Sequence, residues 1–201
     1  MIRQNPFHRP LRVGIAIASI AVSLLAIGSA TAKSYDDAEV AALLPALEQS
    51  RLSLADGVRQ LAKGEESAVS AKFELNDDKQ LSLSVYTAEK GLAVDAEHNV
   101  LKEFAGDPRQ LPWKPEAEVF KDIPHVARAS EHLTLMSQTR MPLAQLIGTA
   151  QKEHKGRVFS AIPAVEDGRG VLVVLIAAGD KVEEFAYDLR TGRQVAHGPG
   201  K

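Results

Sequence analysis

The chain has 201 residues and no cysteine, which excludes disulfides, thiol catalysis and thiolate metal or iron–sulfur sites. Its 24 Lys and Arg residues stand against 26 Asp and Glu residues, a formal net charge of −2. A mildly acidic protein of this kind is a poor candidate for binding nucleic acid or anionic lipid.

The first 32 residues have the pattern of a secretory signal peptide. Three arginines precede an almost wholly apolar run at residues 13–26, and the small-residue sequence Ala30-Thr31-Ala32 follows. The alternative is an uncleaved membrane anchor, but the run is shorter than the roughly 20 residues that a span needs. We therefore expect cleavage after Ala32, a periplasmic or secreted location and no stable membrane anchor. Removal of the three arginines leaves a net charge of −5.

Residues 36–48 predict a helix with an apolar stripe. The stripe consists of Val40, Leu43, Leu44 and Leu47. Acidic residues at the start favour the positive end of the helix dipole. Because Pro45 has no N–H and clashes with the preceding turn, we expect it to kink or divide this helix.

Residues 52–101 predict a first unit, a helix followed by antiparallel strands. Ser53 with Asp56 three residues later is an N-cap signal. In the first strand Ser70, Lys72 and Glu74 alternate with apolar residues. A sheet built from such strands is predicted to have one face in contact with water.

Residues 106–115 contain three prolines and are predicted to link this unit to a second one. Trp113, the only tryptophan, lies between two of them. It has two interpretations: an exposed recognition residue, or a side chain that pins the linker to the core. The second is favoured. From Glu116 onward the pattern predicts a helix that is interrupted near Pro124.

Residues 141–195 predict the second unit. Pro142 suits the first turn of a helix whose apolar spacing covers residues 143–150. The strand at residues 158–164 contains Pro163, which cannot donate to a ladder, so we expect an edge strand or a bulge. Residues 171–176 are continuously apolar and predict a strand that is buried on both faces.

Each unit ends in a predicted turn. The later turn contains Tyr187, Asp188, Thr191 and Gly192. Asp188 is expected to accept backbone N–H bonds just downstream, and Gly192 to supply a positive φ. In the earlier unit Asp95 stands at the place of Asp188, and Asn99 at the place of Gly192. Asn is the non-glycine residue that best tolerates a left-handed conformation.

Helix and strand positions also match between the units. Val69-Ser70-Ala71 aligns with Phe159-Ser160-Ala161, at a spacing near 90 residues. We interpret the matches as an internal repeat. The alternative is that any two helix-and-hairpin units align this loosely.

A helix, two or three strands and a terminal Tyr-Asp-x-x-Thr-Gly sequence resemble the PepSY domain. This domain is found in the propeptides of thermolysin-type proteases and in many bacterial exported or membrane-anchored proteins. The second unit carries the motif, whereas the first has His98-Asn99 in place of Thr-Gly. The resemblance implies a non-catalytic, extracytoplasmic module that modulates peptidases, and it supplies no catalytic residues.

The search for chemistry returns one weak pattern. His125 and His132 lie seven residues apart on a predicted helix, with Glu131 nearby, which makes a metal site conceivable. The stronger i, i+4 spacing is absent, so solvated or hydrogen-bonded histidines are the favoured interpretation. Phosphate loops, zinc-protease motifs and nucleophile elbows do not occur in the sequence. We therefore expect no catalytic, cofactor-binding or metal-binding residues, and no cofactor.

The sequence thus predicts an α+β fold with two tandem helix-plus-antiparallel-sheet units. We expect the N-terminal helix and first unit at residues 33–105, the linker and a connecting helix at 106–140, and the second unit and tail at 141–201. The two sheets are expected to pair edge to edge or to pack face to face.

The leading hypothesis for function is a non-catalytic PepSY-type binding or regulatory protein. It would recognise a protein or peptide partner in the cell envelope, by adding a strand at an exposed sheet edge such as the Pro163 strand. The alternative is a small-ligand or metal carrier that uses the groove between the units. The partner and the oligomeric state stay open.

Overall fold

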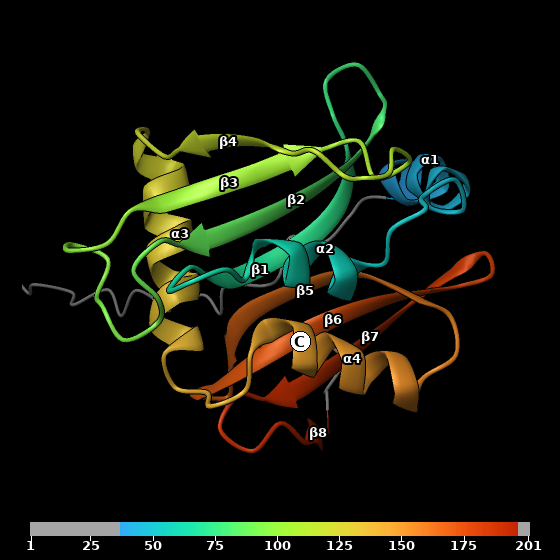
Figure 1. Cartoon of the computed structure of the whole chain (residues 1–201). Coiled ribbons are helices and arrows are strands. Elements are labelled where there is room, and N and C mark those ends of the chain that lie inside the picture. The colour runs from blue at the N-terminus through green and yellow to red at the C-terminus, as the bar shows by residue number, and fades with distance from the viewer. Residues whose placement is uncertain (1–36, 197–201) are drawn as a thin grey trace, which may run out of the picture.

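The computed structural model describes residues 37–196, which form four helices and one eight-stranded antiparallel sheet (Figure 1). The helices are α1 (Asp37–Leu47), α2 (Leu54–Leu61), α3 (Ile123–Met136) and α4 (Leu143–Glu153). The strands are β1 (Ser67–Leu75), β2 (Leu81–Ala88), β3 (Leu101–Gly106), β4 (Glu116–Val119), β5 (Arg157–Glu166), β6 (Arg169–Ala178), β7 (Lys181–Asp188) and β8 (Gln194–Val195). The expected α+β class is confirmed. The expected signal peptide lies outside the described residues.

The sheet consists of two four-stranded meanders that meet at β1 and β5. The strand order is β4-β3-β2-β1-β5-β6-β7-β8. β1 and β5 run antiparallel, with Ala71 opposite Ala161 and Lys72 opposite Ser160. Of the two arrangements left open by the sequence, the strands therefore adopt edge-to-edge pairing.

The two central strands carry irregularities at corresponding places. The β1–β2 register shifts between Ala68 and Ser70, and the β5–β6 register shifts between Val158 and Ser160. Each shift ends one residue before the alanine that faces its counterpart across the β1–β5 pair. A bulge bends its strand and increases the local twist, so both central strands are bent close to the line where the meanders join.

Helices cover both faces of the sheet. A Cβ on Gly57 of α2 would come within 2.3 Å of Leu83 Cδ2, so α2 rests on the face that carries Leu83. α4 lies beside α2 over the same face (Figure 1). The opposite face carries Ser70, whose hydroxyl bonds to His132 of α3 at 2.9 Å. The sheet is the middle layer of three.

The expectation of a wet sheet face in the first meander is wrong. Ser70 and Ser84 are buried on the face that α3 covers, as is Tyr86. Lys72 and Glu74 form an ion pair there and remain partly exposed. The sequence pattern recorded polar side chains correctly, but α3 comes from further along the chain and lies over them.

Residues 116–119 form strand β4, and the helix predicted from Glu116 begins only at Ile123. β3 offers these residues a ladder, with Lys102 opposite Val119 and Ala105 opposite Glu116. Asp122 caps the helix that follows, by accepting a hydrogen bond from the backbone N–H of His125. Pro124 lies in the first turn, where a missing N–H has no helical partner to lose.

Two other prolines also differ from expectation. α1 continues through Pro45, which is exposed and lies in the last turn, so only a terminal part of the helix is affected. β5 is not an edge strand, because it pairs with both β1 and β6, but it carries the bulge that was the other expectation, between Val158 and Ser160. The β1 ladder reaches only Ser160 and Ala161, and Pro163 lies beyond it.

Within residues 37–196, no helix combines the length and hydrophobicity that a bilayer crossing requires.

Candidate recognition surface

β4 forms one edge of the sheet, and its side chains are exposed to solvent. All four of its residues are exposed, and Val119 retains 45% of its accessible surface. β4 pairs with β3 on one side, and no other strand of the described chain pairs with it on the other side. An edge of this kind presents unpaired N–H and C=O groups that a further strand can bond.

The backbone groups that point outward can be assigned. In an antiparallel pair, alternate residues direct their N–H and C=O toward the neighbouring strand. The Phe120 N–H donates to the carbonyl of Leu101 at 3.1 Å. The backbone N–H and C=O groups of Phe120, Glu118 and Glu116 therefore point toward β3. Ala117 and Val119 therefore direct their N–H and C=O groups away from the sheet.

The side chains of β4 divide between the two faces. Glu118 lies opposite Glu103 and Glu116 opposite Ala105, on the face that α3 covers elsewhere. Ala117 and Val119 project from the other face. Within residues 37–196, neither Glu116 nor Glu118 has an ion-pair partner. The strand thus has one acidic side and one small apolar side.

The chain just after β4 is also apolar and exposed. Ile123 retains 83% of its surface, the largest value among the exposed large hydrophobic residues, and Val126 is exposed as well. Phe120 is held between the sheet and α3, because its ring contacts Tyr86 edge-on at 4.7 Å and stacks on His125 at 5.4 Å. The edge therefore continues into an apolar helix start that is held in position.

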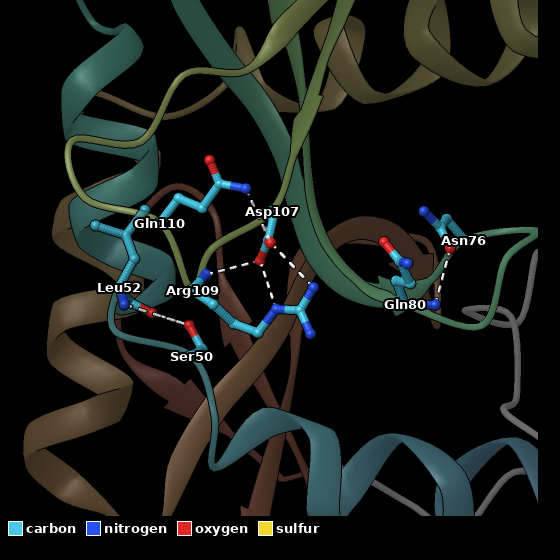
Figure 2. Close-up of polar contacts among 7 residues, drawn as sticks. All are labelled: Ser50, Leu52, Asn76, Gln80, Asp107, Arg109 and Gln110. Atoms are coloured by element: carbon cyan, nitrogen blue, oxygen red, sulfur yellow. Dashed lines mark hydrogen bonds and ion pairs between the residues drawn. The ribbon is translucent and has the colours of Figure 1, made fainter.

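A loop with strong internal bonds holds the β3–β4 hairpin. Asp107 accepts hydrogen bonds from the Arg109 N–H at 2.9 Å and from the Arg109 Nε at 2.8 Å (Figure 2). The Arg109 guanidinium lowers the pKa of Asp107, and the carboxylate raises that of Arg109. The carbonyl of Pro108 accepts from the Arg51 N–H, which ties the loop to the α1–α2 connection. Beside it, Ser50 Oγ donates to the Leu52 carbonyl at 2.7 Å (Figure 2).

Trp113 belongs to this supporting structure. Its side chain is only 4% exposed and packs against the backbone at Gly106, where an added Cβ would lie 3.0 Å from the indole nitrogen. Trp113 is therefore not an exposed recognition residue. The burial agrees with the pinning interpretation.

The opposite edge of the sheet differs from β4. β8 has two residues, and Val195 is partly buried. The Gln194 side chain interacts with His154 Nε2 of α4 at 3.1 Å. A two-residue strand fastened to a helix offers little ladder to a partner.

The turn before β8 has the predicted geometry. Asp188 Oδ1 accepts hydrogen bonds from the N–H groups of Arg190 at 3.0 Å and Thr191 at 2.8 Å. Gly192 has φ +67° and donates to the Asp188 carbonyl at 2.7 Å. Tyr187 is buried and donates its hydroxyl to Glu153 at 2.8 Å, and burial raises the pKa of that hydroxyl. These residues have structural roles.

The earlier turn residues do not occupy the matching place. The loop that contains Asp95 and Asn99 joins β2 to β3, whereas the Asp188 turn joins β7 to β8. Asn99 is not among the described non-glycine residues with positive φ, and it bonds instead through its amide to the carbonyls of Gly91 and Val94. The alignment failed because a twelve-residue loop at 89–100 replaces a two-residue turn.

Asp107, between β3 and β4, makes a turn bond like that of Asp188. Both carboxylates accept from the N–H two residues downstream, that of Arg109 or Arg190. The shared spacing Asp-x-Arg was a sequence signal for this match. It was missed because the proline-rich stretch predicted a linker rather than a hairpin turn.

The histidines of α3 do not converge. His125 bonds to the Asp122 carboxylate and stacks on Phe120. His132 is buried between α3 and the sheet, beside Ser70, and burial lowers the pKa of the His132 imidazole to about 4. In residues 37–196 no group of three or more His, Cys, Asp or Glu side chains is placed to hold a metal.

A groove of about 450 Å³ lies between α2 and α4. Its lining is mixed, with apolar residues such as Leu54 and Ile147 beside the charged residues Arg59 and Lys152. Arg59 is already paired with Asp56. A Cβ on Gly148 would meet nothing within 4 Å, so the α4 wall has room for a larger side chain.

Comparisons with known proteins do not name a family. No family profile matches the chain, and no curated protein matches it. Among solved structures, the chain is similar to the crystal structure of a "putative lipoprotein" from Clostridium difficile 630. The identity is 15%, the match covers 73% of this chain and 92% of the other, and the TM-score is 0.37. A score this low does not establish a common fold.

Proposed function

We propose that this protein is an exported, non-catalytic binding or regulatory protein of PepSY type, which recognises a polypeptide by adding it as a strand to β4. The observation that carries the proposal is the edge itself. β4 is exposed along its whole length, and the N–H and C=O groups of Ala117 and Val119 point away from the sheet. Strand addition bonds such groups to the main chain of an extended peptide.

The proposal includes two tandem units of one design, residues 54–119 and 143–195. Three features support it: the order of four strands in each meander, the corresponding register shifts in β1 and β5, and the pairing of Ala71 with Ala161 at the junction. A helix precedes each meander, and α2 and α4 pack against one another. The outer strands of the two units differ, and recognition is placed at the outer strand of the first.

A proline substitution separates the edge from the rest of the fold. Ala117→Pro removes an outward N–H and leaves the β3–β4 ladder bonds intact, since proline is tolerated in edge strands when its nitrogen faces solvent. Ala117→Thr is the matched control, because it enlarges the same side chain and keeps the N–H. Partners captured from the exported fraction are expected to be lost with Ala117→Pro and retained with Ala117→Thr, at unchanged circular dichroism.

Equal recovery of partners by both variants would contradict strand addition at β4. Amide hydrogen exchange gives a second test, because a partner strand bonded to this edge slows exchange at Ala117 and Val119. Unchanged exchange at both amides, in a sample saturated with a captured partner, also contradicts the proposal.

The groove between α2 and α4 favours a second candidate function, the binding of a small amphipathic ligand. Its volume of about 450 Å³ lies within the range of small-molecule sites. Gly148→Leu would project a large side chain from the α4 side of the groove, where a Cβ has open space, and Gly148→Ala is the control. A metabolite that raises the melting temperature of the Ala variant and not of the Leu variant would support this candidate. A flat response across a broad panel would remove it.

A further inference from the structure

We infer that the segment recognised at β4 alternates cationic and small apolar residues, with Lys or Arg at every second position. This inference rests on the proposed strand addition and specifies its partner. It follows from the two sides of β4, which differ in charge and size.

The acidic side of β4 carries two carboxylates, those of Glu116 and Glu118. Glu116 and Glu118 are two residues apart in a strand, so they project from the same face. Neither forms an ion pair within residues 37–196, whereas the neighbouring Glu103 already bonds to Ser84. Side chains directly opposite one another across a strand pair lie about 5 Å apart. A partner with cations at i and i+2 would place one against each carboxylate.

The other side of β4 selects for size and polarity. Ala117 is small and Val119 is an exposed aliphatic side chain. A residue of the added strand that lies between the two cations projects over this face. An aliphatic side chain there would bury surface against Ala117 and Val119, whereas a charged one would lose hydration without a partner.

The same charges argue against a second copy of this chain as the occupant. Two β4 strands paired edge to edge would bring Glu116 and Glu118 of one copy beside those of the other. Like charges opposite one another destabilise a strand pair, and charged edges commonly prevent self-association. The charges on β4 therefore disfavour pairing with the β4 strand of a second copy and favour pairing with a strand of opposite charge. Lys114 and Lys121 flank β4 but lie outside its ladder with β3.

The test uses the full chain and three labelled hexapeptides. One alternates Lys and Val, one alternates Glu and Val, and one has the first composition with the lysines grouped. Fluorescence anisotropy is expected to show binding of the alternating Lys peptide roughly tenfold tighter than of the alternating Glu peptide at low salt. The grouped peptide is expected to bind more weakly than the alternating one, because its lysines fall on both faces.

Charge reversal at the edge is the decisive variant. Glu116→Lys with Glu118→Lys should invert the preference between the Lys and Glu peptides. The matched control is Asp180→Lys with Glu183→Lys, which changes the net charge by the same amount. Both residues are exposed on the β6–β7 hairpin, in the meander that does not contain β4. The control should preserve the preference. If it abolishes the preference, the attraction is general and the inference fails.

The experiment distinguishes the two levels of the proposal. Peptides that bind with no charge preference, and whose binding Ala117→Pro abolishes, would overturn the inference and leave strand addition standing. Two results together would overturn both proposals: Lys-peptide binding that survives Ala117→Pro, and no protection of the Ala117 and Val119 amides by the peptide in the unsubstituted protein.

Discussion

The two meanders have the same order of antiparallel strands and a bulge at the corresponding place, and they differ on the face beneath α3. In the first meander, Lys72 lies opposite Ser84 on this face. At the corresponding place in the second meander, Ile162 lies opposite Val173. On the other face both meanders are apolar, with Ala71 opposite Val85 and Ala161 opposite Val174. The face toward α2 and α4 therefore specifies the register, and the α3 face is free to differ.

The outer strands differ in the same direction. β4 is a four-residue strand with every side chain exposed, while β8 has two residues and a side-chain contact to α4. The first meander is the more polar and the more open of the two. One strand arrangement thus supports a closed, apolar half and a half with an exposed edge.

Exchanging one residue across the α3 face should produce the largest effect. Val173→Ser removes buried aliphatic carbon and places a hydroxyl among apolar side chains, and we expect a loss of about 3 kcal/mol in the free energy of unfolding. Ser84→Val removes the hydrogen bond to Glu103, whose carboxylate is partly exposed and can hydrate, so we expect a change of about 1 kcal/mol or less. Urea denaturation of both variants measures the difference. Equal losses would show that the polar pair in the first meander is as tightly constrained as the apolar pair.

The polar half should also give the protein a pH dependence that the apolar half lacks. Burial first, then the charges of Arg128 and Lys72, lower the pKa of His132 from 6.5 to about 4. Between these two values the unfolded chain binds a proton that the folded chain does not, so stability is full above about pH 6.5 and falls as the pH drops toward 4. The loss is on the order of 3 kcal/mol.

Denaturation midpoints measured between pH 4 and pH 7 test this dependence. His132→Gln should flatten the slope in that window, at some cost in stability at pH 7 through the contact to Ser70. His154→Gln, a change on the second unit where the ring stacks on Phe185, is the control and should keep the slope. A slope that persists in His132→Gln would place the titrating group elsewhere.

Most of the elements followed from local pattern, and the failures share a cause. Ser53 accepts the predicted N-cap bond from the Asp56 N–H, and the apolar run at residues 171–176 is a strand buried on both faces. Both depend on neighbours in sequence. β4 was missed because Glu116 to Val119 has no strong strand pattern of its own and becomes a strand through its ladder with β3.

The candidate surface was predictable as a kind of site and not as a place. The sequence led to strand addition at an edge, but it located that edge at the Pro163 strand, β5, which pairs with β1 on one side and β6 on the other. Edges are set by strand order, and the strand order here includes the long-range pairing of β1 with β5, which makes β5 a central strand. Glu116 and Glu118 can be read in the sequence, but a role in recognition could be assigned to them only once this segment was known to be the edge strand.

The two glycines of the paired helices give the finest test of the comparison. A Cβ at Gly57 of α2 would lie 2.3 Å from Leu83 Cδ2, and Leu83 is fully buried, whereas a Cβ at Gly148 of α4 would meet nothing within 4 Å. Gly148→Ala should therefore stabilise the protein by about 0.5–1 kcal/mol through helix propensity. Gly57→Ala gains the same propensity but must displace Leu83, and we expect a net loss of about 1 kcal/mol. Melting temperatures should move in opposite directions, by about 2–4 °C per kcal/mol for a chain of this size. A shift of the same sign in both variants would mean that α2 can move off the sheet as freely as α4. The closer packing of α2 against the sheet would then not distinguish it from α4.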